Sequence, residues 1–158
     1  MNEEDLKKLD ALHRAVDSMA ASLSERHSER LQCKRGCYAC CTDGLTVFDI
    51  EAERIRRGVQ DALRGESASD EGCAFLDEHG GCRIYEFRPY VCKTQGLPLR
   101  WFDDSGEHRD ICPLNRTSES LDELEAGECW TIGRAEDILR DLSDGTRVEL
   151  RLLFEELS

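Results

Sequence analysis

Apolar residues near the N-terminus recur with the period of an α-helix. Between Asp5 and Arg30 they follow spacings of three and four, and neither Gly nor Pro interrupts the pattern. The apolar positions are Leu6, Leu9, Leu12, Val16, Met19 and Leu23. This period predicts an amphipathic helix that covers a core, and its near-heptad spacing makes a two-helix dimer seam the alternative. We expect His13 and His27, as lone histidines on a charged helix, to be solvated.

A short strand and a second helix are predicted next. The run Leu45–Phe48 is apolar and favours a strand. Asp49 is a suitable N-cap for a helix over residues 50–63. The arginines of this helix face mainly outward, and we expect them to balance nearby acids, with binding of an anionic partner as the alternative. They are Arg54, Arg56, Arg57 and Arg64.

Two short apolar runs then flank a Gly-Gly pair. The runs Cys73–Leu76 and Cys82–Tyr85 predict a small β-hairpin with a cysteine opening each strand. We expect His79, at the turn, to be solvated. A helical turn that starts at Pro89 would bring Cys92 back toward this hairpin.

The last third of the chain is predicted to be mainly helical. The expected elements are a strand or irregular run over 97–102, a turn over 103–106, and helices over 121–126, 132–142 and from 146 onward. The patterns Ser120-x-x-Glu123 and Thr146-x-x-Glu149 resemble capping boxes for the first and last of these helices. The fold class predicted is therefore mainly α with a small β-hairpin.

Four cysteines crowd into nine residues between the first helix and the first strand. They follow the pattern Cys33-x3-Cys37-x2-Cys40-Cys41. Thiolates are strong, soft metal ligands, and short spacings let one turn of backbone direct two sulfurs at one centre. Gly36 supplies the positive φ that such a loop often needs. This stretch predicts a metal ion or an iron–sulfur cluster.

Five further cysteines are scattered, so only tertiary folding can gather them. The full series is Cys33, Cys37, Cys40, Cys41, Cys73, Cys82, Cys92, Cys112 and Cys129. Disulfides or a redox relay are the first alternative to metal ligation, and burial as a small hydrophobe is realistic for Cys129. The adjacent pair Cys40-Cys41 favours ligation of two centres, or ligation by one thiol and support by the other. Zinc and a [4Fe–4S] cluster both fit, and eight thiols suffice for two four-thiolate centres.

Composition and charge narrow the range of partners. The 158 residues carry a net charge of -13, which opposes binding to nucleic-acid phosphates and anionic membranes. The apolar fraction of 39% is low, and a modest core supplemented by a metal site is expected. No run reaches membrane-spanning length, and Met1–Asp5 lacks the features of a secretory signal, so we expect a cytoplasmic protein with reduced thiols. We predict three parts: an N-terminal helix over 1–31, a metal-binding domain over 32–115, and C-terminal helices over 116–158 that pack on it.

One segment carries a resemblance to a known family. The run from Cys82 to Cys92 reads C-x-I-Y-x-x-R-P-x-x-C, and it follows the clustered cysteines and the sequence Cys73-Ala-Phe-Leu. Together with Cys112, this arrangement resembles the cysteine-cluster family known as CxxCxxCC, or YkgJ-like. The resemblance covers roughly residues 33–112, and it departs from the family pattern at the three-residue first gap and at Lys93.

The resemblance implies chelation of zinc or iron by eight thiols. The implied ligands are Cys33, Cys37, Cys40, Cys41, Cys73, Cys82, Cys92 and Cys112. Tyr85 and Arg88 are expected to support the site from outside the ligand shell. One branch of the family resembles flagellin lysine-N-methylase, so a redox-active or methyl-transferring [4Fe–4S] enzyme is the second hypothesis, although the chain lacks a glycine-rich S-adenosylmethionine loop. The third is an adaptor with a structural metal that binds a protein partner, or a second copy, through the N-terminal helix.

Overall fold

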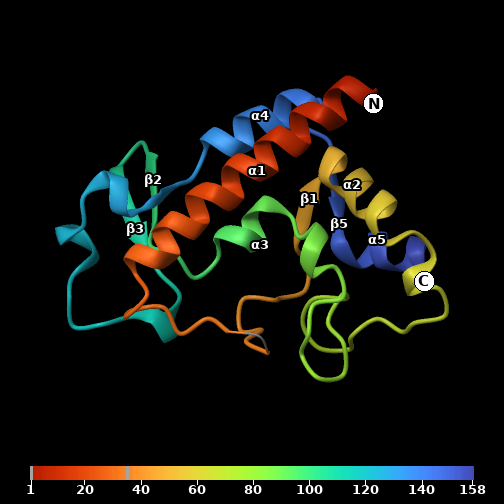
Figure 1. Cartoon of the computed structure of the whole chain (residues 1–158), viewed down its shortest axis with the longest axis horizontal. Helices are drawn as coiled ribbons and strands as arrows, with labels where there is room; N and C mark the ends of the chain where they lie inside the picture. Colours follow the sequence, from red (N-terminus) through yellow and green to blue (C-terminus); the bar gives the residue numbers. More distant parts are fainter. Residues whose placement is uncertain (1, 35) are drawn as a thin grey trace.

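The computed structural model describes residues 2–34 and 36–158, and it is mainly helical with two small sheets (Figure 1). The prediction of a mainly α fold with a small amount of β-structure is confirmed. The helices are α1 (Glu3–Arg26), α2 (Asp49–Val59), α3 (Tyr90–Thr94), α4 (Arg134–Leu142) and α5 (Leu150–Leu157). The strands are β1 (Thr46–Phe48), β2 (Leu99–Asp103), β3 (Gly106–Asp110), β4 (Trp130–Thr131) and β5 (Arg147–Glu149). Short 3₁₀ turns connect several of these elements.

Helix α1 forms as its apolar period predicts. A capping box starts it: the Asp5 amide donates to the Asn2 side chain over 2.9 Å, and the Asn2 amide donates to the Asp5 carboxylate. The apolar stripe is buried within the chain itself, against α2, α3 and α4. The expectation of solvated histidines on this helix was wrong for both, because His13 and His27 continue the buried stripe and are 3% and 7% exposed.

The buried apolar side chains form two clusters. One gathers the stripe of α1 with residues of α3, α4 and β4, and the other packs α2 and α5 around Phe75. Helix α2 contributes to both, through Ile50 to the first cluster and Ile55 to the second. In Figure 1, α1 and α4 run together along the top, and the loops that carry most of the cysteines run along the bottom. The helices thus form a scaffold on one side of the cysteine-rich loops.

The two sheets do not form where the sequence predicted a hairpin. The antiparallel pair β1–β5 joins the start of α2 to the start of α5, and a three-stranded sheet has the order β3-β2-β4. The regular hairpin is β2–β3, with its turn at residues 103–106 as expected. At the predicted hairpin only one antiparallel bridge forms, between Leu76 and Cys82. The reason is that the chain tightens into 3₁₀ turns on leaving Cys82 and does not extend along a partner.

Three helix starts also differ from the sequence predictions. Asp49 is the first residue of α2 and does not cap it, since Phe48 occupies the N-cap position. Thr146 begins no helix, because residues 147–149 pair with β1 before α5 starts. The Ser120 side chain does accept a hydrogen bond from the Asp122 amide, but the helix that it starts is one 3₁₀ turn.

The arginines of α2 and the turn after it form ion pairs with acids, as the sequence predicted. The Arg56 guanidinium lies 2.8 Å from the Glu156 carboxylate, and Arg57 lies 2.8 Å from Glu53. Arg64 pairs with Asp61.

Across the described residues, none of the helices combines the length and the apolar character that crossing a membrane requires.

The Phe75–Phe154 contact is expected to support the second cluster. The two rings meet edge to face with centroids 5.3 Å apart, and Phe154 is 1% exposed. We expect Phe154→Ala to lower the free energy of unfolding by about 3–5 kcal/mol in urea denaturation under reducing conditions. Leu152→Ala, on the exposed side of the same helix, is the matched control and should change it by less than about 0.5 kcal/mol. Equal effects of the two substitutions would contradict this account of the core.

Candidate metal centre

The loop between α1 and β1 is shaped by two short turns. The Cys37 amide donates to the Lys34 carbonyl, and the Cys41 amide donates to the Tyr38 carbonyl, each over 2.9 Å. Gly36 has a φ of +88°, in the left-handed region that glycine adopts readily, as the sequence predicted. These turns place Cys40 and Cys41 at the end of the loop that faces the next cysteine-bearing segment.

A backbone hydrogen bond joins this loop to the second segment. The Cys73 amide donates to the Cys41 carbonyl over 2.9 Å. Gly72, with a φ of +75°, lies so close to that carbonyl that a Cβ would stand 2.5 Å from its oxygen. The Tyr38 ring packs in the same way against Gly80, where a Cβ would meet the ring at 2.5 Å. The two segments therefore touch at two places that only glycine allows.

The second segment is closed by the side chain of Asp77. Its Oδ1 atom accepts hydrogen bonds from the amides of Gly81 (2.7 Å) and His79 (2.8 Å), and these bonds hold the pKa of Asp77 below its usual range. The turn brings Cys82 back beside Leu76, three residues after Cys73. The His79 side chain is exposed at the tip, as the sequence predicted.

The third segment is the short helix α3, which carries Cys92. The Cys92 amide donates to the carbonyl of Pro89 over 3.0 Å. The predicted helical turn beside Pro89 is therefore present. It starts at Tyr90, one residue later than Pro89.

Five thiols from these three segments lie within electrostatic reach of one another. They are Cys40, Cys41, Cys73, Cys82 and Cys92. Burial, and then the charges of Cys73, Cys82 and Cys40, raise the pKa of Cys92 to about 12. Burial also raises the pKa of Cys82, with a further contribution from Cys73. These effects agree with the backbone contacts, the Cys73–Cys41 hydrogen bond and the Leu76–Cys82 bridge, which bring the first two segments together.

The adjacent thiols Cys40 and Cys41 differ strongly in acidity. The Cys41 thiol donates a hydrogen bond to the Cys40 sulfur and thereby lowers the pKa of Cys40 to about 6. The positive charge of Arg88 contributes to the same shift. The pKa of Cys41 is raised by that hydrogen bond, by burial, and by the charges of neighbouring thiols. One member of the pair is thus ready to ionise while the other holds its proton.

Cys33 and Cys112 belong to a different arrangement, centred on the fully buried Asn115. The Asn115 side-chain amide donates to the Cys33 sulfur (3.3 Å) and to the Gly96 carbonyl (2.8 Å). Its backbone amide donates to the Cys112 carbonyl over 2.8 Å. A Cβ on Gly96 would stand 2.5 Å from the Cys33 sulfur, so glycine is required there.

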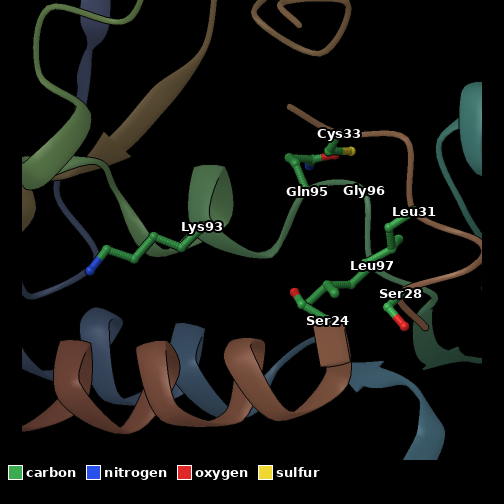
Figure 2. Close-up of a pocket in the computed structure, with 8 residues that line it drawn as sticks. All are labelled: Ser24, Ser28, Leu31, Cys33, Lys93, Gln95, Gly96 and Leu97. Carbon is green, nitrogen blue, oxygen red and sulfur yellow. The ribbon is translucent and has the colours of Figure 1, made fainter. Parts of the chain in front are cut away.

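The exposed Cys33 also lines a shallow cavity of about 290 Å³ (Figure 2). In Figure 2, Leu31 and Leu97 line the same hollow, while the Lys93 side chain reaches away from it. Lys93 pairs instead with Asp17 of α1 at 2.8 Å. Its aliphatic stem, and not its charge, contributes to the cavity wall.

The two predicted supporting residues form one unit. The Arg88 guanidinium stacks 3.6 Å from the centroid of the Tyr85 ring, and its Nε donates to the Tyr85 carbonyl over 2.9 Å. Tyr85 is 54% exposed and does not pack beneath the thiols. Within the described ranges, Arg88 forms no ion pair with a carboxylate. Its charge acts on the thiols of Cys40 and Cys82.

Cys129 and Cys37 lie outside both arrangements. Cys129 is 7% exposed in the core, as expected for a small hydrophobe. All nine cysteines lie in described residues, and none is joined to another as a disulfide. Cys37 is half-buried. Among residues 2–34 and 36–158, no three Cys, His, Asp or Glu side chains stand in an arrangement that could hold a metal ion as they lie.

Sequence reasoning missed two residues that shape this region. Asn115 is a lone polar residue in a loop, and nothing in its neighbours predicts that it is buried or that it contacts Cys33. Glu51 lies in the first turn of α2, a helix whose charged residues were expected to face solvent, yet Glu51 is 2% exposed. The sequence offered one signal, the position of Glu51 between the apolar residues Ile50 and Ala52, and that position alone does not predict a buried carboxylate.

These features define a small, mainly helical protein with a thiol-rich loop region. Residues 32–117, more than half of the chain, match the family model CxxCxxCC, described as "Putative zinc- or iron-chelating domain". The chain belongs to this family, as the motif around Cys82 and Cys92 predicted. No curated protein and no solved structure matches the chain.

The acidity of Cys40 can be tested in the metal-free protein. At pH 7 we expect iodoacetamide to alkylate Cys40 faster than Cys41, because a pKa of about 6 leaves Cys40 mostly as the reactive thiolate. The rate at Cys40 should fall as the pH drops below about 6, since the thiolate is then protonated. Cys41→Ala removes the hydrogen-bond donor and should slow the reaction of Cys40 at pH 7. Tandem mass spectrometry of the labelled peptide measures each site, and faster labelling of Cys41 would refute the assignment.

Proposed function

We propose that the protein binds zinc or iron through a thiolate centre built from Cys40 or Cys41 together with Cys73, Cys82 and Cys92. The observation that carries the proposal is the contact between cysteine-bearing segments: the Cys73 amide donates to the Cys41 carbonyl over 2.9 Å, and a bridge sets Cys82 beside Leu76. The raised pKa of Cys92, to which Cys73 and Cys82 contribute, supports the same grouping. Thiols that are reduced and gathered in this way are characteristic of metal sites. Family membership supports the same chemistry.

The donor set fits a soft or borderline metal. Four thiolates suit either a tetrahedral zinc ion or a [4Fe–4S] cluster. The side chains would have to rotate from their present directions to bind one. The backbone hydrogen bond from the Cys73 amide to the Cys41 carbonyl can stay intact while the side chains rotate. The proposal also requires a reducing compartment, in agreement with the predicted cytoplasmic location.

Adjacent cysteines cannot easily direct both sulfurs at one tetrahedral ion, so one of the pair is assigned to the metal. We assign Cys40 to the metal because its pKa is lowered to about 6, and Cys41 to supporting it by the hydrogen bond that it donates. Arg88 offsets part of the negative charge that the thiolates bring together. Burial raises the pKa values of Cys73, Cys82 and Cys92, so metal binding there displaces protons.

Cys33, Cys37 and Cys112 stay candidate ligands of a second thiol site; of these, the Cys33 sulfur and the Cys112 carbonyl both contact Asn115. The Asn115 side-chain amide donates to the Cys33 sulfur over 3.3 Å and holds it in place. A chain with two centres would bind the second metal more weakly, because Cys33 is exposed and so less constrained. The enzyme and adaptor hypotheses share this metal chemistry, but no contact among the described residues favours either one.

Metal content tests the proposal directly. We expect protein purified without oxygen to hold at least one zinc, or about four irons with absorption near 400 nm, by elemental analysis and spectroscopy. Cys82→Ser and Cys92→Ser should lose most of this metal, while Cys129→Ser, a buried thiol outside the proposed set, should retain it. Wild-type protein that binds neither metal after reconstitution would overturn the proposal.

Metal removal should also destabilise the fold. We expect a chelator to lower the free energy of unfolding by about 3 kcal/mol or more, because binding to the folded state alone is lost. Thermal melts with and without chelator measure the change. Cys92→Ser is the control, and its melting temperature should be nearly the same in both conditions. An equal chelator effect on this variant would show that the stabilising metal lies elsewhere.

A further inference from the structure

A buried carboxylate lies beside the helix that carries Cys92. Glu51 is 2% exposed in the first turn of α2, between Ile50 and Ala52, which are both fully buried. Burying a carboxylate is strongly unfavourable unless hydrogen bonds or an opposite charge compensate. The Glu51 carboxylate therefore requires polar or charged partners, which the surrounding apolar side chains cannot provide.

Two partners from two other helices meet this carboxylate. The backbone amide of Tyr90 donates to Glu51 Oε1 over 2.8 Å. His13 of α1, itself 3% exposed, places its Nε2 atom 3.3 Å from the same oxygen, within ion-pair distance. In the described residues, neither ring nitrogen of His13 has a hydrogen-bond partner, so Glu51 is the group that can compensate it. One carboxylate thus links α1, α2 and α3.

The hydrogen bond to Tyr90 caps α3. Tyr90 is the first residue of this helix, and the preceding N-cap, Pro89, provides no side-chain acceptor. The first amides of a helix have no partner within it, and a negative charge at this end is favourable. A helix of five residues is not stable by itself, so its direction depends on external contacts. The Tyr90 side chain and Val91 pack in the first apolar cluster, and Glu51 adds a buried polar contact at the first amide of the helix.

A second polar attachment of α3 lies nearer the surface. Lys93 forms an ion pair with Asp17 of α1 at 2.8 Å, in which the Lys93 side chain is 7% exposed and the Asp17 carboxylate 57% exposed. Solvent screens the carboxylate side of this pair. Cys92 lies two residues after Tyr90, so a shift at the start of α3 moves its thiol directly. The charge of Glu51 also acts on the Cys92 thiol, which places the two groups near each other.

We propose that Glu51, held by His13, is a positioning residue for the metal centre: its carboxylate fixes the start of α3 and thereby the direction of Cys92. This inference rests on the proposed metal-binding function. It assigns to α1 and α2 a role in metal affinity, although neither helix carries a cysteine.

The test uses the full-length protein and Co²⁺ as a spectroscopic probe, without oxygen. Glu51→Met removes the acceptor at similar volume, and Glu51→Gln keeps an oxygen that can accept from the Tyr90 amide. Asp17→Asn removes the exposed attachment of the same helix and is the matched control. We expect Glu51→Met to weaken Co²⁺ binding about 10- to 100-fold and to shift the ligand-field bands. Glu51→Gln and Asp17→Asn should stay within about threefold of wild type with unchanged bands.

Circular dichroism of the metal-free variants checks that they fold. If Glu51→Met is unfolded, Glu51→Asp replaces it, since the shorter side chain keeps the charge but withdraws the acceptor from Tyr90. It should weaken Co²⁺ binding while Glu51→Gln does not. Wild-type affinity and bands in a folded Glu51→Met or Glu51→Asp variant would overturn the positioning role.

A second readout separates this inference from the proposed function. In the metal-free protein, Cys92 should be alkylated several-fold faster in Glu51→Met than in wild type, because α3 is released, while labelling of Cys33 should not change. If wild-type protein bound no Co²⁺, the proposed function would fail, and unchanged labelling of Cys92 would additionally overturn the positioning role.

Discussion

The hydrogen bond from the Cys73 amide to the Cys41 carbonyl fixes the relation between two loops that have little regular structure of their own. It depends on Gly72, whose missing side chain allows the carbonyl to approach. Two further contacts support it: the Tyr38 ring packs on Gly80, and Arg151 pairs with Asp43 of the loop while donating to the carbonyls of Ser69 and Gly72. The approach of the two loops therefore involves a backbone hydrogen bond, a ring packed on glycine and an arginine bridge.

The helices supply the stiffness that the loops lack. Helix α2 is central because it enters both apolar clusters, through Ile50 and Ile55. Glu51 lies between those two contacts and extends the same scaffold to the start of α3. Loop-borne ligands gain precision when residues outside the site hold their supports in place. Here the support is a buried polar link, which costs free energy to bury and is retained at a position beside the proposed site.

Charge is a second constraint on the thiol-rich region. The chain has a net charge of -13, and gathering several thiolates adds to the local negative charge. The protein meets this with Arg88, which stacks on Tyr85 and directs its charge at Cys40 and Cys82. The thiols in the buried part stay protonated because their pKa values are raised. A bound cation would compensate the remaining negative charge, which is consistent with the chelation that the family description states.

The sequence by itself determined the class of chemistry and the main helices. Cysteine spacing identified the family, and apolar periodicity located α1, α2 and α4, because both signals are local. The tertiary structure decided which cysteine-bearing segments meet: the segment of Cys73 and Cys82 is bonded to the loop of Cys40 and Cys41, while the Cys33 sulfur and the Cys112 carbonyl both contact Asn115. It also decided that His13 and Glu51 are buried together. Such pairings join positions tens of residues apart, and their energy arises from burial and hydrogen bonds that no local pattern records.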